Sequence, residues 1–187
     1  MATLDELLQD AARRMDKSVE STRHELNSIR TGRASPALLD RIQIDYYGQL
    51  TPLNQMAQIG APESRLLTIQ PYDPTQIKAI EKAIQESDLG LTPSNDGKLI
   101  RLPVPQLTEE RRKELVKVVR HMAEEGRVAV RNVRRDVMKH LEDLAKKGDV
   151  GDDDERAAEG RVQKLTDEHT TKIDDLLKRK EAEIMEV

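Results

Sequence analysis

The chain has 187 residues, of which 31 are Lys or Arg and 35 are Asp or Glu, with three Tyr and no Phe, Trp or Cys. The lack of cysteine excludes disulfides, thiolate metal sites and thiol nucleophiles. Only 36% of the residues are hydrophobic, which favours thin layers of long amphipathic helices over a thick core. No apolar run is long enough for a secretory signal or a membrane span, so we expect a cytoplasmic protein. Because the net charge is −4, affinity for nucleic acid requires local segregation of charge.

The distribution of proline divides the chain into three parts. All eight Pro lie between Pro36 and Pro105. Proline is incompatible with the interior of a helix, so residues 1–30 and 106–187 are free to form long helices and residues 31–105 are not. The sequence therefore predicts an α+β protein in which a small domain is inserted into a helical one.

The first flank has the pattern of one long amphipathic helix. Thr3 and Glu6 have the spacing of a capping box, in which each side chain binds the backbone N–H of the other residue. The apolar positions that follow recur every three or four residues, which predicts a helix of about 27 residues. These positions are Leu4, Leu8, Ala11, Met15, Val19, Thr22, Leu26 and Ile29.

The insert alternates strand and helix signals. Residues 42–46 alternate apolar and polar side chains, and residues 65–70 are rich in strand formers. Asp73 and Pro74 are typical of a helix start, and residues 95–97 (Asn-Asp-Gly) of a tight turn that joins two short strands. The apolar face of the predicted helix is Ile77, Ile80, Ala83 and Ile84. These signals together indicate a small α/β unit.

The second flank has the pattern of two antiparallel helices. We expect one from an N-cap at Thr108 to a C-cap at Gly148, and another from Asp152, because the four residues from Gly148 to Gly151 allow only a tight turn. The first is expected to bury Leu115, Val119, Met122, Ala129, Val133, Val137, Leu141 and Leu144. The second is expected to bury Ala158, Val162, Leu165, Ile173, Leu176 and Ile184. With the N-terminal helix, a monomeric three-helix bundle is the simplest arrangement.

Two linkers join the insert to the bundle, near residues 31–36 and 103–107. Since the helices on both sides must pack together, the linkers lie close to each other and form a natural hinge. Glycine adds backbone freedom at this point. The predicted hinge residues are Thr31, Gly32, Ser35, Pro103 and Pro105.

No pattern of side chains indicates catalysis. The four His have no partner at the spacing of a metal site or a triad, and we interpret His140 and His169 as partly buried packing residues. The acidic run Asp152–Glu155 is explained by the positive end of a helix rather than by a cation. No phosphate-binding loop occurs. We therefore expect no catalytic residue, no metal and no cofactor, and an enzyme with its site in the insert is disfavoured.

One face of the second long helix is basic. From Arg111 to Arg135 there are nine Lys or Arg against three Glu. A solvated face is the ordinary interpretation, but this face is nearly of one sign and its arginines suit phosphate, which indicates RNA or DNA. With few aromatic residues to stack on bases, we expect recognition of a folded nucleic acid by its backbone. The predicted contacts are Lys113, Lys117, Arg120, Arg127, Arg131 and Arg134. The alternative is an adaptor whose basic face binds an acidic protein.

Several blocks of sequence, in order and over essentially the whole chain, are similar to the bacterial ribosome recycling factor family. They are RTGRASPALLD at 30–40, YYG at 46–48 with TPL at 51–53, SDLG at 87–90, LTEERRKEL at 107–115, RVAVRNVRRD at 127–136 and the closing KEAE.

The resemblance implies an L-shaped protein with a three-helix bundle as the long arm and a β/α/β sandwich as the short arm. It also implies a factor that binds the 70S ribosome across the tRNA sites after termination, with its bundle on large-subunit ribosomal RNA. With elongation factor G and GTP, such a factor splits the subunits and releases mRNA and tRNA, and hydrolyses nothing itself. By the same resemblance, Arg131 and Arg134 match the RNA-contacting arginines of the family, and Arg30 and Arg33 match its basic positions at the elbow.

Overall fold

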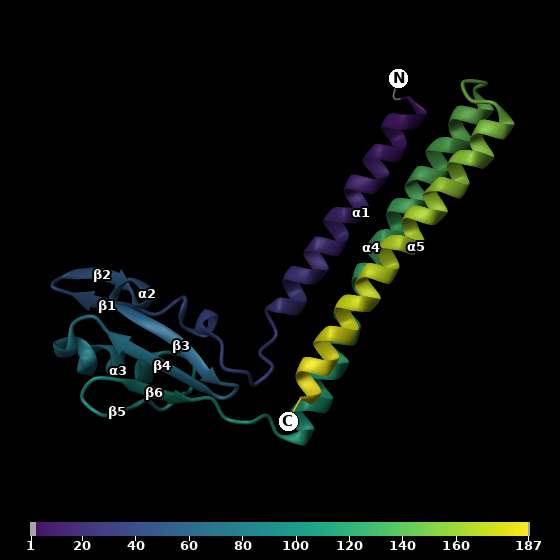
Figure 1. Cartoon of the computed structure of the whole chain (residues 1–187). Coiled ribbons are helices and arrows are strands. Elements are labelled where there is room, and N and C mark those ends of the chain that lie inside the picture. Colours follow the sequence, from purple (N-terminus) through teal and green to yellow (C-terminus); the bar gives the residue numbers. More distant parts are fainter. Residues whose placement is uncertain (1–2, 187) are drawn as a thin grey trace. The chain divides into compact units, whose positions relative to one another are not determined.

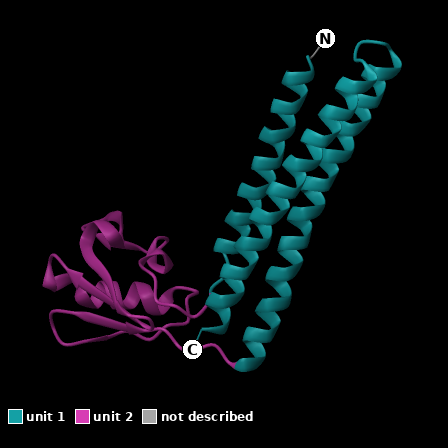
Figure 2. Cartoon of the chain, turned by 45° about the vertical axis from the view of Figure 1, so that its right-hand side comes forward, with its two compact units in different colours: residues 1–30, 109–187 teal, residues 31–108 magenta. Residues whose placement is uncertain are grey.

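The computed structural model describes residues 3–186 and divides into two compact units (Figures 1 and 2). Unit 1 comprises residues 1–30 and 109–187, and unit 2 comprises residues 31–108. Within the described residues, no helix is both long and apolar enough to cross a membrane. The predicted class, a helical bundle with an inserted α+β domain, is confirmed.

Unit 1 consists of three long helices that lie side by side (Figure 1). They are α1 (Leu4–Asn27), α4 (Glu109–Lys146) and α5 (Asp152–Met185). The capping box before α1 is confirmed: the backbone N–H of Thr3 donates to Glu6 Oε2 at 2.8 Å, and that of Glu6 to Thr3 Oγ1 at 3.2 Å. This local signal fixes where the first helix begins.

A tight turn after α4 makes α5 antiparallel to it, as predicted. Gly148 has a φ of +75°, a conformation that favours glycine. The N–H of Gly148 donates to the carbonyl of Ala145, and that of Asp149 to the carbonyl of Leu144, both at 3.0 Å. These two bonds form a Schellman cap, which satisfies the last carbonyls of α4 and reverses the chain.

The buried stripe of α4 differs from the predicted one in its middle. Ala123, Gly126 and Val130 are buried, whereas Met122 and Ala129 are only half buried. The prediction favoured the larger side chain, Met122. The structure instead places small residues where α4 packs against both neighbouring helices, because small side chains allow the close approach.

Polar side chains also enter the core of unit 1. His169 is 3% exposed, with its Nδ1 2.6 Å from the carbonyl of Leu165 and its Nε2 2.7 Å from Asp16 Oδ1. The packing role predicted for this histidine is confirmed, and its imidazole links α5 to α1. The same prediction was wrong for His140, which is exposed because it lies outside the buried stripe.

Unit 2 combines two antiparallel sheets with short helices. Its strands are β1 (Gln43–Tyr46), β2 (Gln49–Pro52), β3 (Ala57–Glu63), β4 (Leu66–Pro71), β5 (Ser94–Asn95) and β6 (Ile100–Pro103). Its helices are α2 (Leu53–Met56), α3 (Ile77–Glu86) and the 3-10 turns Pro36–Leu39 and Pro74–Gln76. β1 and β2 form a hairpin, and the larger sheet has the order β3-β4-β6-β5.

The predicted elements of unit 2 are present, and further ones appear. The turn at residues 95–97 joins β5 to β6 as expected, and Asp73 caps the 3-10 turn that leads into α3. The sequence did not indicate β3, which contains Gly60 and Pro62. β3 is an edge strand, where a proline that lacks an N–H does not break a ladder on both sides.

One apolar core holds unit 2 together. The buried face of α3, Ile77, Ile80 and Ile84, belongs to the same cluster as Leu67 of β4 and Leu102 of β6. The core of unit 1 is a separate cluster made by the three long helices.

Candidate nucleic-acid interface

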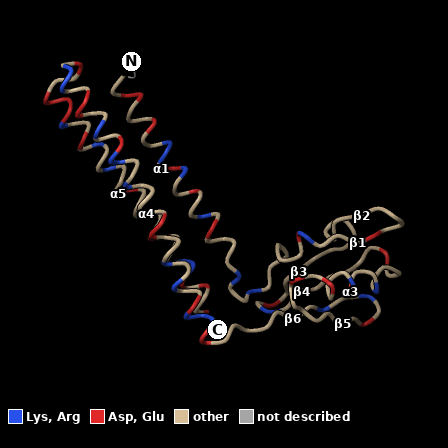
Figure 3. Tube along the Cα trace, turned by 180° about the vertical axis from the view of Figure 1, so that it is seen from behind, with Lys and Arg blue, Asp and Glu red and all other residues tan. Residues whose placement is uncertain are grey.

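The six basic residues predicted on α4 lie on one side of this helix, but carboxylates lie among them. Figure 3 shows charges of both signs along the bundle. Arg127 and Arg134 are half buried, and the other four are exposed. The expectation of a face of nearly one sign is therefore wrong, since acidic residues of α4 and α5 are paired with its arginines.

Two of these arginines form ion pairs with α5. Arg120 Nε donates to Glu181 Oε1 at 2.6 Å, and Arg127 Nε donates to Asp174 Oδ1 at 2.8 Å. The two arginines are seven residues apart on α4, and their partners are seven apart on α5, in the opposite direction. We call this repeat the interhelix ladder. It follows from the antiparallel register, because seven residues bring a helix back to nearly the same side after two turns.

The next position of the ladder is different. Arg134 lies seven residues beyond Arg127, and Asp167 lies seven before Asp174. Here Gln163 stands between the two charges, since its Oε1 accepts from Arg134 Nη1 at 3.2 Å and its Nε2 donates to Asp167 Oδ1 at 2.9 Å. Arg134 is thus oriented by a neutral amide, and no ion pair to it occurs among residues 3–186.

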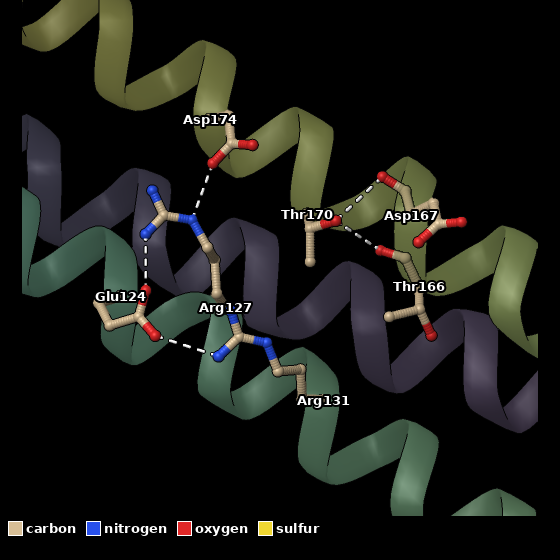
Figure 4. A network of polar contacts seen from close by, with 7 residues as sticks. All are labelled: Glu124, Arg127, Arg131, Thr166, Asp167, Thr170 and Asp174. Carbon is tan, nitrogen blue, oxygen red and sulfur yellow. Dashed lines mark hydrogen bonds and ion pairs between the residues drawn. The ribbon is translucent and has the colours of Figure 1, made fainter.

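Glu124 holds two arginines of α4 at once (Figure 4). Its Oε2 accepts from Arg127 Nη1 at 2.9 Å and its Oε1 from Arg131 Nη1 at 3.1 Å. The hydrogen bond from Arg131, followed by that from Arg127, lowers the pKa of Glu124. Partial burial would lower the pKa of Arg127, but its hydrogen bonds to Asp174 and Glu124 outweigh burial and raise it. Both shifts favour the charged forms of Glu124 and Arg127.

The remaining predicted contacts are at exposed positions. Lys113 pairs with Glu109 of its own helix at 2.9 Å, an exposed contact. Lys117 and Arg30 are exposed, and neither has an ion pair within the described part of the chain. Arg33 is exposed as well, in the first linker.

Arg112 has an unusual environment that the sequence does not indicate. The residue is half buried, and its Nε is buried without a hydrogen-bond partner in residues 3–186. A buried donor without an acceptor is rare in folded proteins. The sequence carries no sign of it, because Arg112 is one of three consecutive basic residues.

Both predicted linkers are tied to the turn between β3 and β4. The N–H of Ala34 donates to the carbonyl of Ser64 at 2.7 Å, and the N–H of Val104 to the carbonyl of Arg65 at 2.8 Å. Adjacent residues of one turn therefore hold the two chain segments where they meet unit 2.

Beyond these bonds, the two linkers touch at Gly32. Its φ is +77°, and a Cβ on this residue would lie 3.0 Å from Leu107 Cγ. Glycine is thus required here both for its backbone conformation and for the space beside Leu107.

No described group of three or more His, Cys, Asp or Glu side chains could hold a metal ion. The site consists of cations arranged on a rigid helix, with carboxylates that neutralise some of them. Such an arrangement has the charge and geometry that suit a polyanion.

The family model described as "Ribosome recycling factor" matches residues 22–185. The chain belongs to the ribosome recycling factor family. It is 61% identical over 180 residues to the ribosome-recycling factor of Rubrobacter xylanophilus, covering 96% of this chain and 97% of the relative. It is 55% identical over 182 residues to that of Bacillus subtilis, covering 97% and 98%.

Two solved structures of the family are also similar. The solution structure of a ribosome recycling factor is 41% identical, with a TM-score of 0.75 and all of both chains covered. A second is 49% identical, with a TM-score of 0.64, 99% of this chain covered and all of the other. It comes from models of the ribosome recycling factor of T. thermophilus and elongation factor G of E. coli bound to the E. coli post-termination complex.

Proposed function

We propose that this protein recycles ribosomes after translation termination. It binds the post-termination 70S ribosome across the tRNA sites and, with elongation factor G and GTP, splits the subunits and releases mRNA and tRNA. Membership of the family supports this function, as does the post-termination complex named for a relative 49% identical to this chain. The protein acts as a cytoplasmic monomer and is not itself an enzyme, because the GTP is hydrolysed by its partner.

The bundle is the part that holds large-subunit ribosomal RNA. The observation that carries this assignment is the uncompensated charge of Arg134, fixed in place by Gln163 at 3.2 Å. A guanidinium that is oriented but not neutralised is suited to bind an RNA phosphate. Arg131, which shares Glu124 with Arg127, is the second anchor. The remaining proposed contacts are Lys113, Lys117, Arg120, Arg30 and Arg33.

Charge reversal tests this assignment. We expect Arg134→Glu to weaken binding to bacterial 50S subunits about tenfold or more, because a charged hydrogen bond contributes ~1.5–3 kcal/mol. The dependence of log affinity on log salt should also become shallower by about one unit. Co-sedimentation with 50S subunits over a range of salt concentrations measures both.

A matched control separates a local contact from the effect of net charge. Arg179 is exposed on α5, two residues before Glu181 and hence about 200° around that helix from the ladder. Arg179→Glu changes the net charge by the same amount and should bind nearly as well as the parent. Equal binding by the Arg134→Glu variant and the parent, with helicity retained in both, would refute the assignment.

The two linkers are proposed to act as the hinge between the units. Their ties to residues 64 and 65 are on the unit 2 side, which leaves residues 31–33 and 105–108 as the segments that can bend. Gly32 and Pro105 lie within them, and Thr31 precedes Gly32. Ser35 and Pro103 instead flank the residues that are held by the turn.

A further inference from the structure

We propose that Glu124, Asp174 and Glu181 are internal competitors of RNA phosphate, which limit how tightly the basic face of α4 holds ribosomal RNA. This inference rests on the proposed function and concerns the regulation of the same site. The three carboxylates would keep binding reversible, so that the protein can leave the ribosome after each round.

The geometry of the pairs is that of a phosphate site already occupied. A carboxylate and a phosphate present similar oxygen atoms to a guanidinium and use the same N–H donors. Arg120 Nε is 2.6 Å from Glu181, Arg127 Nε is 2.8 Å from Asp174, and Arg127 Nη1 is 2.9 Å from Glu124. An RNA phosphate can reach these donors only by displacing a carboxylate.

The displacement does not require the bundle to open. The side chains of Arg120 and Arg131 are 64% and 45% exposed, and Glu124 is 50% exposed. Exposed ion pairs contribute little to stability, so a phosphate can replace such a carboxylate at low cost. Arg127 is only 20% exposed and has two carboxylate partners, which makes it the most strongly held of the set.

The arginines of this face therefore differ in how strongly carboxylates hold them. At Arg134 the neutral Gln163 takes the place of a carboxylate partner, and the amide of Gln163 binds Asp167 instead. Figure 4 shows Asp167 and Asp174 on α5. Arg134 is open to phosphate, Arg131 shares one carboxylate, and Arg127 is closed. This order makes one strong contact and several weaker ones, whereas a face without the acids would hold RNA at every arginine.

The decisive experiment removes the competing charge while retaining the shape of the side chains. The ladder variant carries Asp174→Asn and Glu181→Gln. The control variant carries Glu168→Gln and Asp175→Asn, two exposed acids of α5 that lie one residue from a ladder position and thus about 100° from it. Both variants change the net charge by +2. Because the chain has no cysteine, Ser94→Cys in all versions gives a single labelling site in unit 2.

Fluorescence of the labelled proteins is measured on titration with bacterial 50S subunits and on dissociation after dilution. We expect the ladder variant to bind about tenfold more tightly than the parent, with slower dissociation and a steeper dependence on salt. The control variant should differ from the parent by about twofold or less, because it acts only through screened, long-range charge.

Other outcomes overturn the inference. Equal tightening in both variants would mean that net charge alone sets the affinity. Weaker binding by the ladder variant would mean that the carboxylates serve to orient the arginines. If circular dichroism shows that the ladder variant loses helicity, Glu124→Gln decides the question, since its partners lie on its own helix and its loss cannot separate α4 from α5. If the parent itself fails to bind, the proposed function fails; if only the tightening is absent, this inference alone fails.

Discussion

Asp96 organises the turn between β5 and β6 by accepting hydrogen bonds at both of its carboxylate oxygens. Its Oδ1 is 2.8 Å from the N–H of Leu99 and 3.0 Å from that of Lys98, and its Oδ2 is 3.1 Å from Arg101 Nη1. These bonds, that of Leu99 first, lower the pKa of Asp96 from 3.8 to about 2. A carboxylate bound in this way stabilises the folded state while it is ionised.

The sign of the resulting pH dependence follows from the lowered value. The stabilisation is fully present above pH 3.8 and is lost as the pH falls through about 2. Asp96→Asn should therefore lower the midpoint of thermal unfolding at pH 6. The difference in this midpoint between variant and parent should shrink steadily as the pH falls from 3.8 to about 2. Calorimetry over this range measures the difference. A difference that stays constant with pH would contradict the account.

The sequence predicts Arg134 as a contact residue, but it does not predict the acidic partners of Arg120 and Arg127. The basic spacing on α4 is local and visible. The acids that pair with Arg120 and Arg127 lie 61 and 47 residues away along the chain, and their register is set by the turn at Gly148. Only the packed helices bring these charges together.

At the scale of elements, the close packing of the three helices depends on Gly126 of α4. A Cβ at this position would overlap Thr22 Oγ1 of α1 and lie 3.2 Å from Ile173 Cδ1 of α5. Gly160 of α5 is the opposite case, because a Cβ there meets nothing within 4 Å. Making the same substitution at Gly126 and at Gly160 therefore separates the cost of overpacking from the effect of helix propensity.

We expect opposite effects from the same substitution at these positions. Gly126→Ala should destabilise the protein by about 1–3 kcal/mol through overpacking. Gly160→Ala should stabilise it by about 0.5–1 kcal/mol, because alanine is the better helix former. Urea denaturation followed by circular dichroism gives both values. An unchanged or raised stability of Gly126→Ala would show that α1 and α4 are not packed this closely.

The helices were easier to predict than the strands for a physical reason. The capping box of α1 and the glycine cap of α4 are made by residues close in sequence. β2 and β3 owe their existence to pairing partners, and β3 contains Gly60 and Pro62, which disfavour a strand when read in isolation. The error in the buried stripe of α4 has the same origin, since only the neighbouring helices select Ala123 and Gly126 for the core.

At the scale of the whole molecule, the division into two units is what the proposed mechanism uses. In that mechanism unit 1 carries the proposed RNA-binding face, and unit 2 is joined to it by two segments that meet at Gly32 and Leu107. A factor that only bound RNA would not need this arrangement. We infer that bending at the linkers converts the action of the GTPase into separation of the subunits.

The conversion of post-termination ribosomes into subunits tests this account most directly. Light scattering or gradient sedimentation is followed after the protein is added with elongation factor G and GTP. We predict rapid splitting by the parent, and none by a protein whose units are joined through one introduced cysteine in each, although this locked protein still binds. Splitting no faster than with elongation factor G and GTP alone would contradict the central claim, and full activity of the locked protein would contradict the hinge.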